Sequence, residues 1–208
     1  MSITKEYLQP LGVMPVVVIE NAADAVAITH ALKAGGIKAI EVTLRTPAAL
    51  AAIRTIKAEC QGIEVGVGTV VNRQQLDDIA EIGVDFAISP GFTPRLIQHA
   101  QSVGVEMLPG VATLSEVMMG MECGLSCFKL FPAVAVGGIP LLKSIAGPLP
   151  QISFCPTGGL TVDNFTDFLA LPNVACVGGS WLVPQTLVAE RNWQAITDIA
   201  AATMAKIG

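Results

Sequence analysis

Residues 38–70 read KAIEVTLRTPAALAAIRTIKAECQGIEVGVGTV, a sequence in which two short apolar segments flank a helix-like one. The two flanking segments are rich in β-branched residues, which is typical of buried strands. Between them, Thr46 is a suitable N-cap and Pro47 suits a first helical turn, so we predict a helix over residues 47–59. Strand, helix and strand in this order indicate a βαβ unit whose two strands are parallel.

The same alternation extends in both directions from this unit over nearly the whole chain. Strands are predicted over residues 14–19, 38–44, 64–70, 86–89, 106–108, 127–131, 153–156 and 175–177. Helices are predicted over residues 21–34, 47–59, 72–82, 93–103, 113–122, 138–146 and 162–171, and from about residue 192 onward. The helix over residues 113–122 also has a capping box, formed by Thr113 and Glu116.

Eight strands, each followed by a helix, predict an α/β protein with a parallel sheet and with the helices outside it. In about 200 residues this pattern fits a compact (β/α)8 TIM barrel, with an open doubly wound sheet as the alternative. Because no linker and no change in composition interrupts the pattern, we expect residues 1–208 to form a single domain. The segment before Met14 predicts a short N-terminal helix that covers the bottom of the barrel.

The composition and charge exclude several classes of protein. Hydrophobic residues make up 52% of the chain and charged residues 14%, which excludes an intrinsically disordered protein. The longest uncharged run, residues 168–189, could span a bilayer by length. Its prolines, glycines and polar residues favour a strand, turns and a helix start instead, so no membrane partner is expected. A net charge of −5 without a basic tract argues against a nucleic-acid partner.

The cysteines do not follow the pattern of a disulfide-stabilised secreted protein. They are Cys60, Cys123, Cys127, Cys155 and Cys176, an odd number without paired CxxC spacing. The N-terminal residues contain Glu6 and no sustained apolar stretch, so no secretory signal is predicted. We therefore expect a reducing, cytoplasmic location.

The second predicted strand places polar side chains inside the barrel. Side chains alternate along a strand, so Glu41, Thr43 and Arg45 share one face and the apolar residues between them share the other. The apolar face suits the helix layer, which leaves Glu41 and Arg45 pointing inward, where unpaired charges are costly. They are interpreted as an acid/base and an anion clamp, or alternatively as a structural ion pair.

Lys129 is the only charged residue in the sixth predicted strand, where Phe128 and Leu130 flank it. A lysine in such a position is rarely a solvated surface residue, and apolar surroundings favour its neutral amine. A neutral amine is the nucleophile that forms Schiff bases with carbonyl substrates. The competing interpretation is a core lysine that is paired with Glu41, and the two roles are compatible.

Two glycine-rich segments follow the seventh and eighth predicted strands. They read Pro156-Thr157-Gly158-Gly159 and Gly178-Gly179-Ser180-Trp181. Barrel enzymes frequently bind phosphate at these two loops, where glycines let backbone N–H groups approach an anion. Thr69 and Pro90 also lie at the carboxyl ends of strands and could shape the same pocket, although each is a weak signal alone.

The sequence gives little support for a metal or a nucleotide cofactor. His30 and His99 both fall within predicted helices, and no cluster of histidine, cysteine and acidic residues has metal-ligand spacing. No GxGxxG motif follows the first predicted strand, so a dinucleotide cofactor is not indicated. From the residues alone we expect no metal and no dinucleotide cofactor.

Six motifs along the chain resemble those of the class I 2-keto-3-deoxy-6-phosphogluconate (KDPG) aldolase family, also called the KDPG/KHG aldolases. They are IEVTLRT (40–46), GVGTV (66–70), FAISPG (86–91), FKLFPA (128–133), FCPTGG (154–159) and GGSWL (178–182). They occur in this order and cover nearly the whole chain, so the resemblance is specific.

The resemblance implies a role for each candidate residue. Lys129 would form the Schiff base and Glu41 would be the general acid/base. The substrate-binding residues would be Arg45 and Thr69 at the pyruvyl carboxylate, Pro90 and Phe131 at the pocket wall, and Thr157, Gly158, Gly159, Gly179 and Ser180 at the distal phosphate.

The resemblance further implies a homotrimer without metal or cofactor that serves the Entner–Doudoroff pathway. Such an enzyme splits KDPG into pyruvate and glyceraldehyde 3-phosphate, and also splits 4-hydroxy-2-oxoglutarate into pyruvate and glyoxylate. Two alternatives remain at this point. A 6-phospho-2-keto-3-deoxygalactonate aldolase would use the same lysine and glutamate, and a non-catalytic phosphosugar-binding barrel would need neither.

Overall fold

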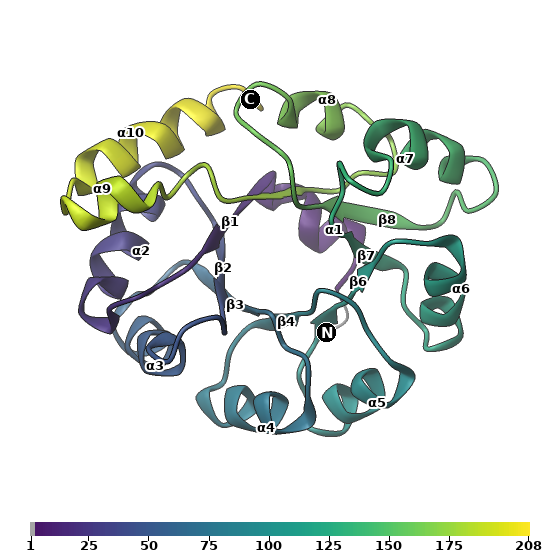
Figure 1. The fold of residues 1–208 in the computed structure, drawn as a ribbon, viewed down its shortest axis with the longest axis horizontal. Helices are drawn as coiled ribbons and strands as arrows, with labels where there is room; N and C mark the ends of the chain where they lie inside the picture. The colour runs from purple at the N-terminus through teal and green to yellow at the C-terminus, as the bar shows by residue number, and fades with distance from the viewer. Residues whose placement is uncertain (1–2) are drawn as a thin grey trace.

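The computed structural model describes residues 3–208, and all of its strand pairs are parallel. Figure 1 shows the strands arranged around a common centre, with helices α2 to α10 (residues 25–204) outside them. The strands are β1 (Val13–Val17), β2 (Ala39–Thr43), β3 (Glu64–Gly68), β4 (Phe86–Ile88), β5 (Met107–Leu108), β6 (Gly110–Val111), β7 (Cys127–Leu130), β8 (Ser153–Pro156) and β9 (Val177–Gly179).

The α-helices alternate with these strands, as the sequence predicted. They are α1 (Lys5–Leu8), α2 (Ala25–Ala34), α3 (Ala49–Glu59), α4 (Arg73–Ile82), α5 (Pro94–Ser102), α6 (Leu114–Glu122), α7 (Gly138–Ala146), α8 (Phe165–Leu169), α9 (Gln185–Ala189) and α10 (Trp193–Met204). Two short 3-10 helices, η1 (Gln9–Leu11) and η2 (Ala22–Asp24), precede β1 and α2. Among residues 3–208, no helix is both long and apolar enough to cross a bilayer.

The strands form two hydrogen-bonded sheets. Six strands lie in the order β5-β4-β3-β2-β1-β9 and three in the order β6-β7-β8. Pro109 separates β5 from β6, because proline has no N–H to donate to a ladder. On the other side, isolated parallel bridges join Phe154 to Val174 and Thr157 to Gly178. The predicted strand over residues 106–108 thus corresponds to β5, and β6 was not predicted.

The two faces of the strands pack into different apolar clusters, as alternation predicted. Ile40 and Val42 of β2 belong to the large cluster under the helices. Ala39 of the same strand belongs to a smaller inner cluster that includes Phe86, Leu108 and Cys127. The inner face of β2 is thus separated from the helix layer, and Glu41 lies on that inner face.

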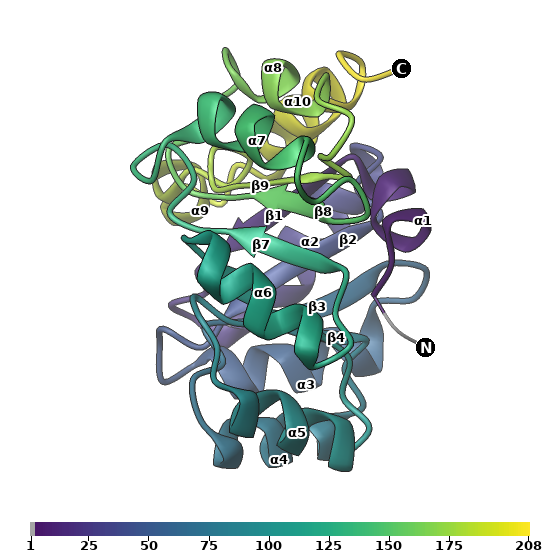
Figure 2. The ribbon, with the colours of Figure 1, turned by 90° about the vertical axis from the view of Figure 1, so that its right-hand side faces the viewer.

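The N-terminal helix closes one end of the inner cluster. Figure 2 shows α1 at one end of the strands. Leu8 and Leu11 pack there against Ala39 and Phe86, which are the first residues of β2 and β4. The prediction that a short N-terminal helix covers the bottom of the strands is confirmed, and the opposite end is left for the functional groups.

Several predicted boundaries differ from the structure, and two of the differences have a clear physical reason. Thr46 does not cap α3, because its hydroxyl donates to the Ile19 carbonyl at 2.5 Å and the helix begins only at Ala49. The last strand covers Val177–Gly179 rather than residues 175–177, since Gly178 and Gly179 pair with Met14 and Pro15. Glycine is a poor signal for a strand, which explains the second error.

Candidate active site

A buried lysine and a buried glutamate meet in the interior. Lys129 of β7 and Glu41 of β2 are 88 positions apart in the chain, and Lys129 Nζ lies 3.0 Å from Oε1 and 3.1 Å from Oε2 of Glu41. Their side chains are only 5% and 2% exposed. The sequence-based pairing of these two residues is confirmed. An ion pair buried this deeply costs desolvation energy, which makes it a strong candidate for a functional group.

The elements around Lys129 fix its amine. Its backbone N–H donates to the Pro109 carbonyl at 2.9 Å, which holds β7 at the break between β5 and β6. The neighbouring residue Leu130 packs in the outer cluster, so the lysine must point inward. The ammonium lies 5.3 Å from the centre of the Phe131 ring, within the range of a cation–π interaction. Phe131 therefore lies beside the amine, as expected of a pocket residue.

Arg45 and Thr69 lie together at the carboxyl ends of β2 and β3. Arg45 Nε donates to the Thr69 hydroxyl at 3.2 Å, and the arginine side chain is exposed. Thr69 has a φ of +64°, which is an uncommon conformation for a β-branched residue and costs about 1–3 kcal/mol. Strain of this kind concentrates at functional sites. The predicted carboxylate clamp thus has two polar groups already in contact.

The two predicted phosphate loops lie side by side. Thr157 is buried and pairs with Gly178 through an isolated bridge, which brings the ends of β8 and β9 together. Gly158 and Gly159 have φ values of +97° and +82°, a region that only glycine adopts without strain. Ser180 is exposed directly after β9. The arrangement suits an anion bound by backbone N–H groups.

Two predicted site residues, Gly179 and Pro90, lie in close contact with other parts of the chain. A Cβ on Gly179 would lie 1.7 Å from the Trp181 ring, so only glycine fits there. Pro90 follows β4, and its carbonyl oxygen would lie 2.3 Å from a Cβ on Gly110. Pro90 also lines a cavity of about 610 Å³ together with Arg73 and Arg95.

The histidines lie on the helices, away from Lys129. His99 on α5 is 2.7 Å from Asp77 on α4, an interaction between two outer helices. Within the described residues, no group of three or more histidine, cysteine or acidic side chains could hold a metal ion.

Comparison with known proteins places this site in a family. The family described as KDPG and KHG aldolase matches residues 4–199 of the chain. The chain belongs to this family.

Known members of the KDPG/KHG aldolase family are similar over nearly their full length. The chain is 46% identical to the 2-dehydro-3-deoxy-phosphogluconate aldolase of Pseudoalteromonas atlantica over 193 residues, which are 93% of this chain and 90% of that protein. It is 48% identical to the KHG/KDPG aldolase of Escherichia coli K12 over 188 residues, 90% of this chain and 88% of the relative.

A solved structure of a KDPG aldolase has the same fold. The enzyme from Legionella pneumophila, with pyruvate captured at low pH as a covalent carbinolamine intermediate, matches with a TM-score of 0.93. The identity is 44%, and the match covers 97% of this chain and 98% of the Legionella chain.

One feature of this KDPG/KHG aldolase site was missed in the sequence. Gly68 was regarded only as part of a strand and a motif, but a Cβ there would lie 2.2 Å from Glu41 Oε1. The signal was present, because glycine inside a strand often marks a close approach of another group. The sequence alone does not say which group approaches.

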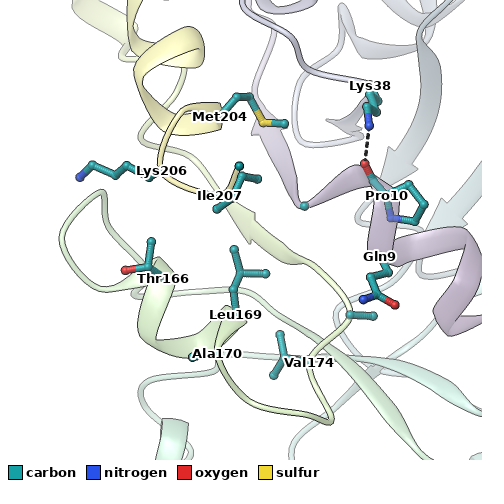
Figure 3. Close-up of a pocket in the computed structure, with 13 residues that line it drawn as sticks. Gln9, Pro10, Lys38, Thr166, Leu169, Ala170, Val174, Met204, Lys206 and Ile207 are labelled. Carbon is teal, nitrogen blue, oxygen red and sulfur yellow. Dashed lines mark hydrogen bonds between the residues drawn. The ribbon is translucent and has the colours of Figure 1, made fainter.

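A separate cavity of about 480 Å³ lies at the amino ends of β1, β2 and β9. Figure 3 shows it between η1, α8 and α10, with Leu169, Met204 and Ile207 among its walls. Lys38 Nζ donates to the Pro10 carbonyl there at 2.9 Å. None of the predicted site residues lines this cavity, which is therefore separate from the candidate active site.

Proposed function

We propose that Lys129 and Glu41 are the catalytic residues of a class I aldolase that cleaves KDPG to pyruvate and glyceraldehyde 3-phosphate. The observation that supports these roles is the contact of the buried Lys129 amine with both oxygens of Glu41. The chain is an aldehyde-lyase of the KDPG/KHG type, as its relatives are. Cleavage of 4-hydroxy-2-oxoglutarate follows from the same chemistry, because the bond that breaks lies in the same position.

The reaction begins with the amine. The nucleophile is the neutral amine of Lys129, and the adjacent Glu41 carboxylate, 3.0 Å away, is the group that accepts a proton from it. The amine adds to the ketone carbon C2 and forms a carbinolamine, which loses water to give a protonated imine. The positive nitrogen is then the electron sink for the next step.

Carbon–carbon cleavage follows from the imine. Glu41, again a carboxylate, accepts the proton of the C4 hydroxyl while the C3–C4 bond breaks and its electrons enter the imine. The aldehyde leaves, and pyruvate remains bound as an enamine. Protonation at C3 and addition of water then release pyruvate and regenerate Lys129. A positioned acid/base of this kind contributes about 10²–10⁴-fold to the rate.

The remaining site residues bind the two ends of the substrate. Arg45 and the Thr69 hydroxyl would hold the carboxylate, supported by their contact at the ends of β2 and β3. Ser180 and the glycine loops after β8 and β9 would hold the distal phosphate through backbone N–H groups. Pro90 and Phe131 would form the wall between these ends.

We also propose that the two sheets act as one closed (β/α)8 barrel and one domain. The bridges from Phe154 to Val174 and from Thr157 to Gly178 support closure on one side, and the continuity through Pro109 supports it on the other. The homotrimer implied by the family resemblance and the cytoplasmic location expected from the cysteines stay predictions.

Borohydride trapping tests the role of Lys129. Incubation with pyruvate and borohydride should add one reduced pyruvyl group to the protein, located on Lys129 by peptide mapping. Lys129→Ala should abolish both labelling and aldol cleavage, because no other group supplies the covalent sink. Lys143→Ala, which removes an exposed lysine from α7, is the control and should be labelled like the wild type.

Labelling of a different lysine, or cleavage by Lys129→Ala at a rate near that of the wild type, would remove Lys129 from the mechanism. The galactonate alternative shares this chemistry and differs in the C4 configuration. Parallel assays of the two C4 epimers therefore decide between the substrates once Lys129 is labelled.

A further inference from the structure

The carboxylate of Glu41 lies directly over a glycine of the neighbouring strand. Gly68 is buried at the end of β3, and a Cβ on it would lie 2.2 Å from Glu41 Oε1, 2.7 Å from Cγ and 2.8 Å from Cδ. Real Cβ atoms do not approach other atoms this closely, so the two side chains could not share the space.

The register of β2 and β3 explains the contact. Glu41 is paired with Gly66, and Thr43 is paired with Gly68. The Glu41 side chain therefore leans along β2 by two residues toward the carboxyl end of the sheet, as side chains in strands do. This lean carries its carboxylate across Gly68 and up to Lys129 on β7, which belongs to the other sheet.

The requirement for glycine at this position is spatial. Gly68 is not among the glycines with a positive φ, so an alanine could adopt its backbone conformation. What an alanine would change is the volume next to Glu41. Because the Glu41 side chain is 2% exposed in a close-packed interior, its carboxylate has little room to move aside.

We propose that Gly68 is a positioning residue for the aldolase reaction: its missing side chain is what lets the Glu41 carboxylate reach the Lys129 amine. The proposal rests on the acid/base role of Glu41 given above. A methyl group at Gly68 would push the carboxylate away from Nζ, and a shift of about 1 Å in a reacting group can cost about 10²-fold in rate.

The same strand offers a matched control. Gly66 is also buried in β3, two residues away and on the same face, but a Cβ there would lie 2.1 Å from Cε2 of Phe86. Phe86 belongs to the inner apolar cluster at the bottom of the strands. Gly66→Ala therefore disturbs core packing by a similar overlap, in which the three nearest atoms belong to the Phe86 ring and not to the Glu41 carboxylate.

Steady-state kinetics, melting temperature and borohydride trapping should be measured for Gly68→Ala, Gly66→Ala, Glu41→Ala and the double variant Gly68→Ala with Glu41→Ala. We expect Gly68→Ala to lower kcat by about 10²-fold with little change in KM, and to label Lys129 with pyruvate more slowly but to the same extent. Gly66→Ala should lower the melting temperature and leave kcat within about twofold.

The double variant tests whether the loss of activity in Gly68→Ala comes from the overlap with the Glu41 side chain. Alanine at position 41 lacks Cγ, Cδ and the carboxylate, which are the Glu41 atoms that a Cβ at position 68 would overlap. In the Glu41→Ala background, Gly68→Ala should therefore lower the residual rates of cleavage and of labelling by much less than 10²-fold, a clear departure from additivity. The double variant should also fold if Gly68→Ala alone does not, so the coupling remains measurable.

A wild-type kcat in Gly68→Ala, an equal loss of kcat in Gly66→Ala, or additive effects in the double variant would each overturn the proposal. Failure of the catalytic assignment gives a different result: Lys129 would then remain unlabelled in the wild-type protein. The two failures are thus distinguishable in one set of experiments.

Discussion

At the scale of single residues, the ion pair of Lys129 and Glu41 combines a stability cost with a chemical use. Two charges that are taken out of water lose hydration energy that their mutual attraction only partly returns. The pair lies on the inner face of the strands, where the neighbouring cluster consists of apolar side chains such as Ala39 and Cys127. Its chemistry therefore explains its presence better than stability does.

Removing one partner of the pair should destabilise the fold more than removing both. Lys129→Met leaves a buried carboxylate without its partner, and we expect it to lower the free energy of unfolding by about 3–5 kcal/mol. Combining it with Glu41→Leu removes both charges and should recover most of that loss. Urea denaturation of the two variants checks this, and a double variant as unstable as Lys129→Met would contradict it.

The residue scale also shows what a sequence can and cannot reveal about a site. Alternation along β2 predicted that Glu41 faces inward, and the isolated charge in β7 predicted the same for Lys129. Their contact joins two strands, β2 and β7, that do not pair with each other. A local sequence pattern does not predict which unpaired strands face one another. Gly68 was missed for a different reason: its strand pairs with β2, but its role depends on how far the Glu41 side chain of β2 leans along that strand.

At the scale of elements, the capping box predicted at Thr113 is confirmed, because its side chain accepts a hydrogen bond from the first turn of α6. Asn72 and Thr93, the first residues of two other predicted helices, also cap their helices, which the sequence analysis did not state. Thr46 failed as a cap because a tertiary acceptor, the Ile19 carbonyl, took its hydroxyl. The break at Pro109 and the strand over Gly178 and Gly179 were missed, since both depend on pairing with distant strands.

The capping box of α6 gives a prediction for the pH dependence of stability. Burial alone would raise the pKa of Glu116, but hydrogen bonds from the N–H groups of Ala112 and Thr113 and from the Thr113 hydroxyl lower it overall. A carboxyl group whose pKa is lowered by folding stabilises the protein above its unfolded pKa, and this stabilisation is lost as the pH falls through the folded pKa.

Glu116→Ala should therefore lower the free energy of unfolding by about 1 kcal/mol at neutral pH, and the difference from the wild type should shrink in acid. Urea denaturation at a series of pH values measures it. Glu122→Ala, at the other end of α6, is the control and should show no such trend. A difference that is constant with pH would mean that the carboxylate does not cap the helix.

At the scale of the whole molecule, the two ends of the strands have different tasks. The amino ends are closed by α1, where Tyr7 packs edge-on against Phe86 at 6.1 Å and donates its hydroxyl to Glu64. The candidate catalytic and binding residues lie in the interior and toward the carboxyl ends. In (β/α)8 barrels, residues at the carboxyl ends of the strands commonly serve catalysis, and residues at the amino ends commonly serve stability.

This division predicts that damage at the closed end affects stability but not substrate binding. Leu8 is fully buried in the inner cluster, so Leu8→Ala should lower the free energy of unfolding by about 2–5 kcal/mol through the cavity that it leaves. KM and kcat at a temperature where the variant is folded should match the wild type. A selective rise in KM would show that the two ends are coupled.

The contact of Glu41 with Lys129 also joins the two sheets of the molecule. Glu41 belongs to the six-stranded sheet and Lys129 to the three-stranded one, so their contact adds a hydrogen-bonded link between two ladders that are also joined at Pro109, at the isolated bridges and through the inner apolar cluster. In the proposed mechanism, each catalytic cycle breaks this contact and then forms it again. The link between the two sheets would therefore weaken and recover once per turnover, as pyruvate binds and leaves.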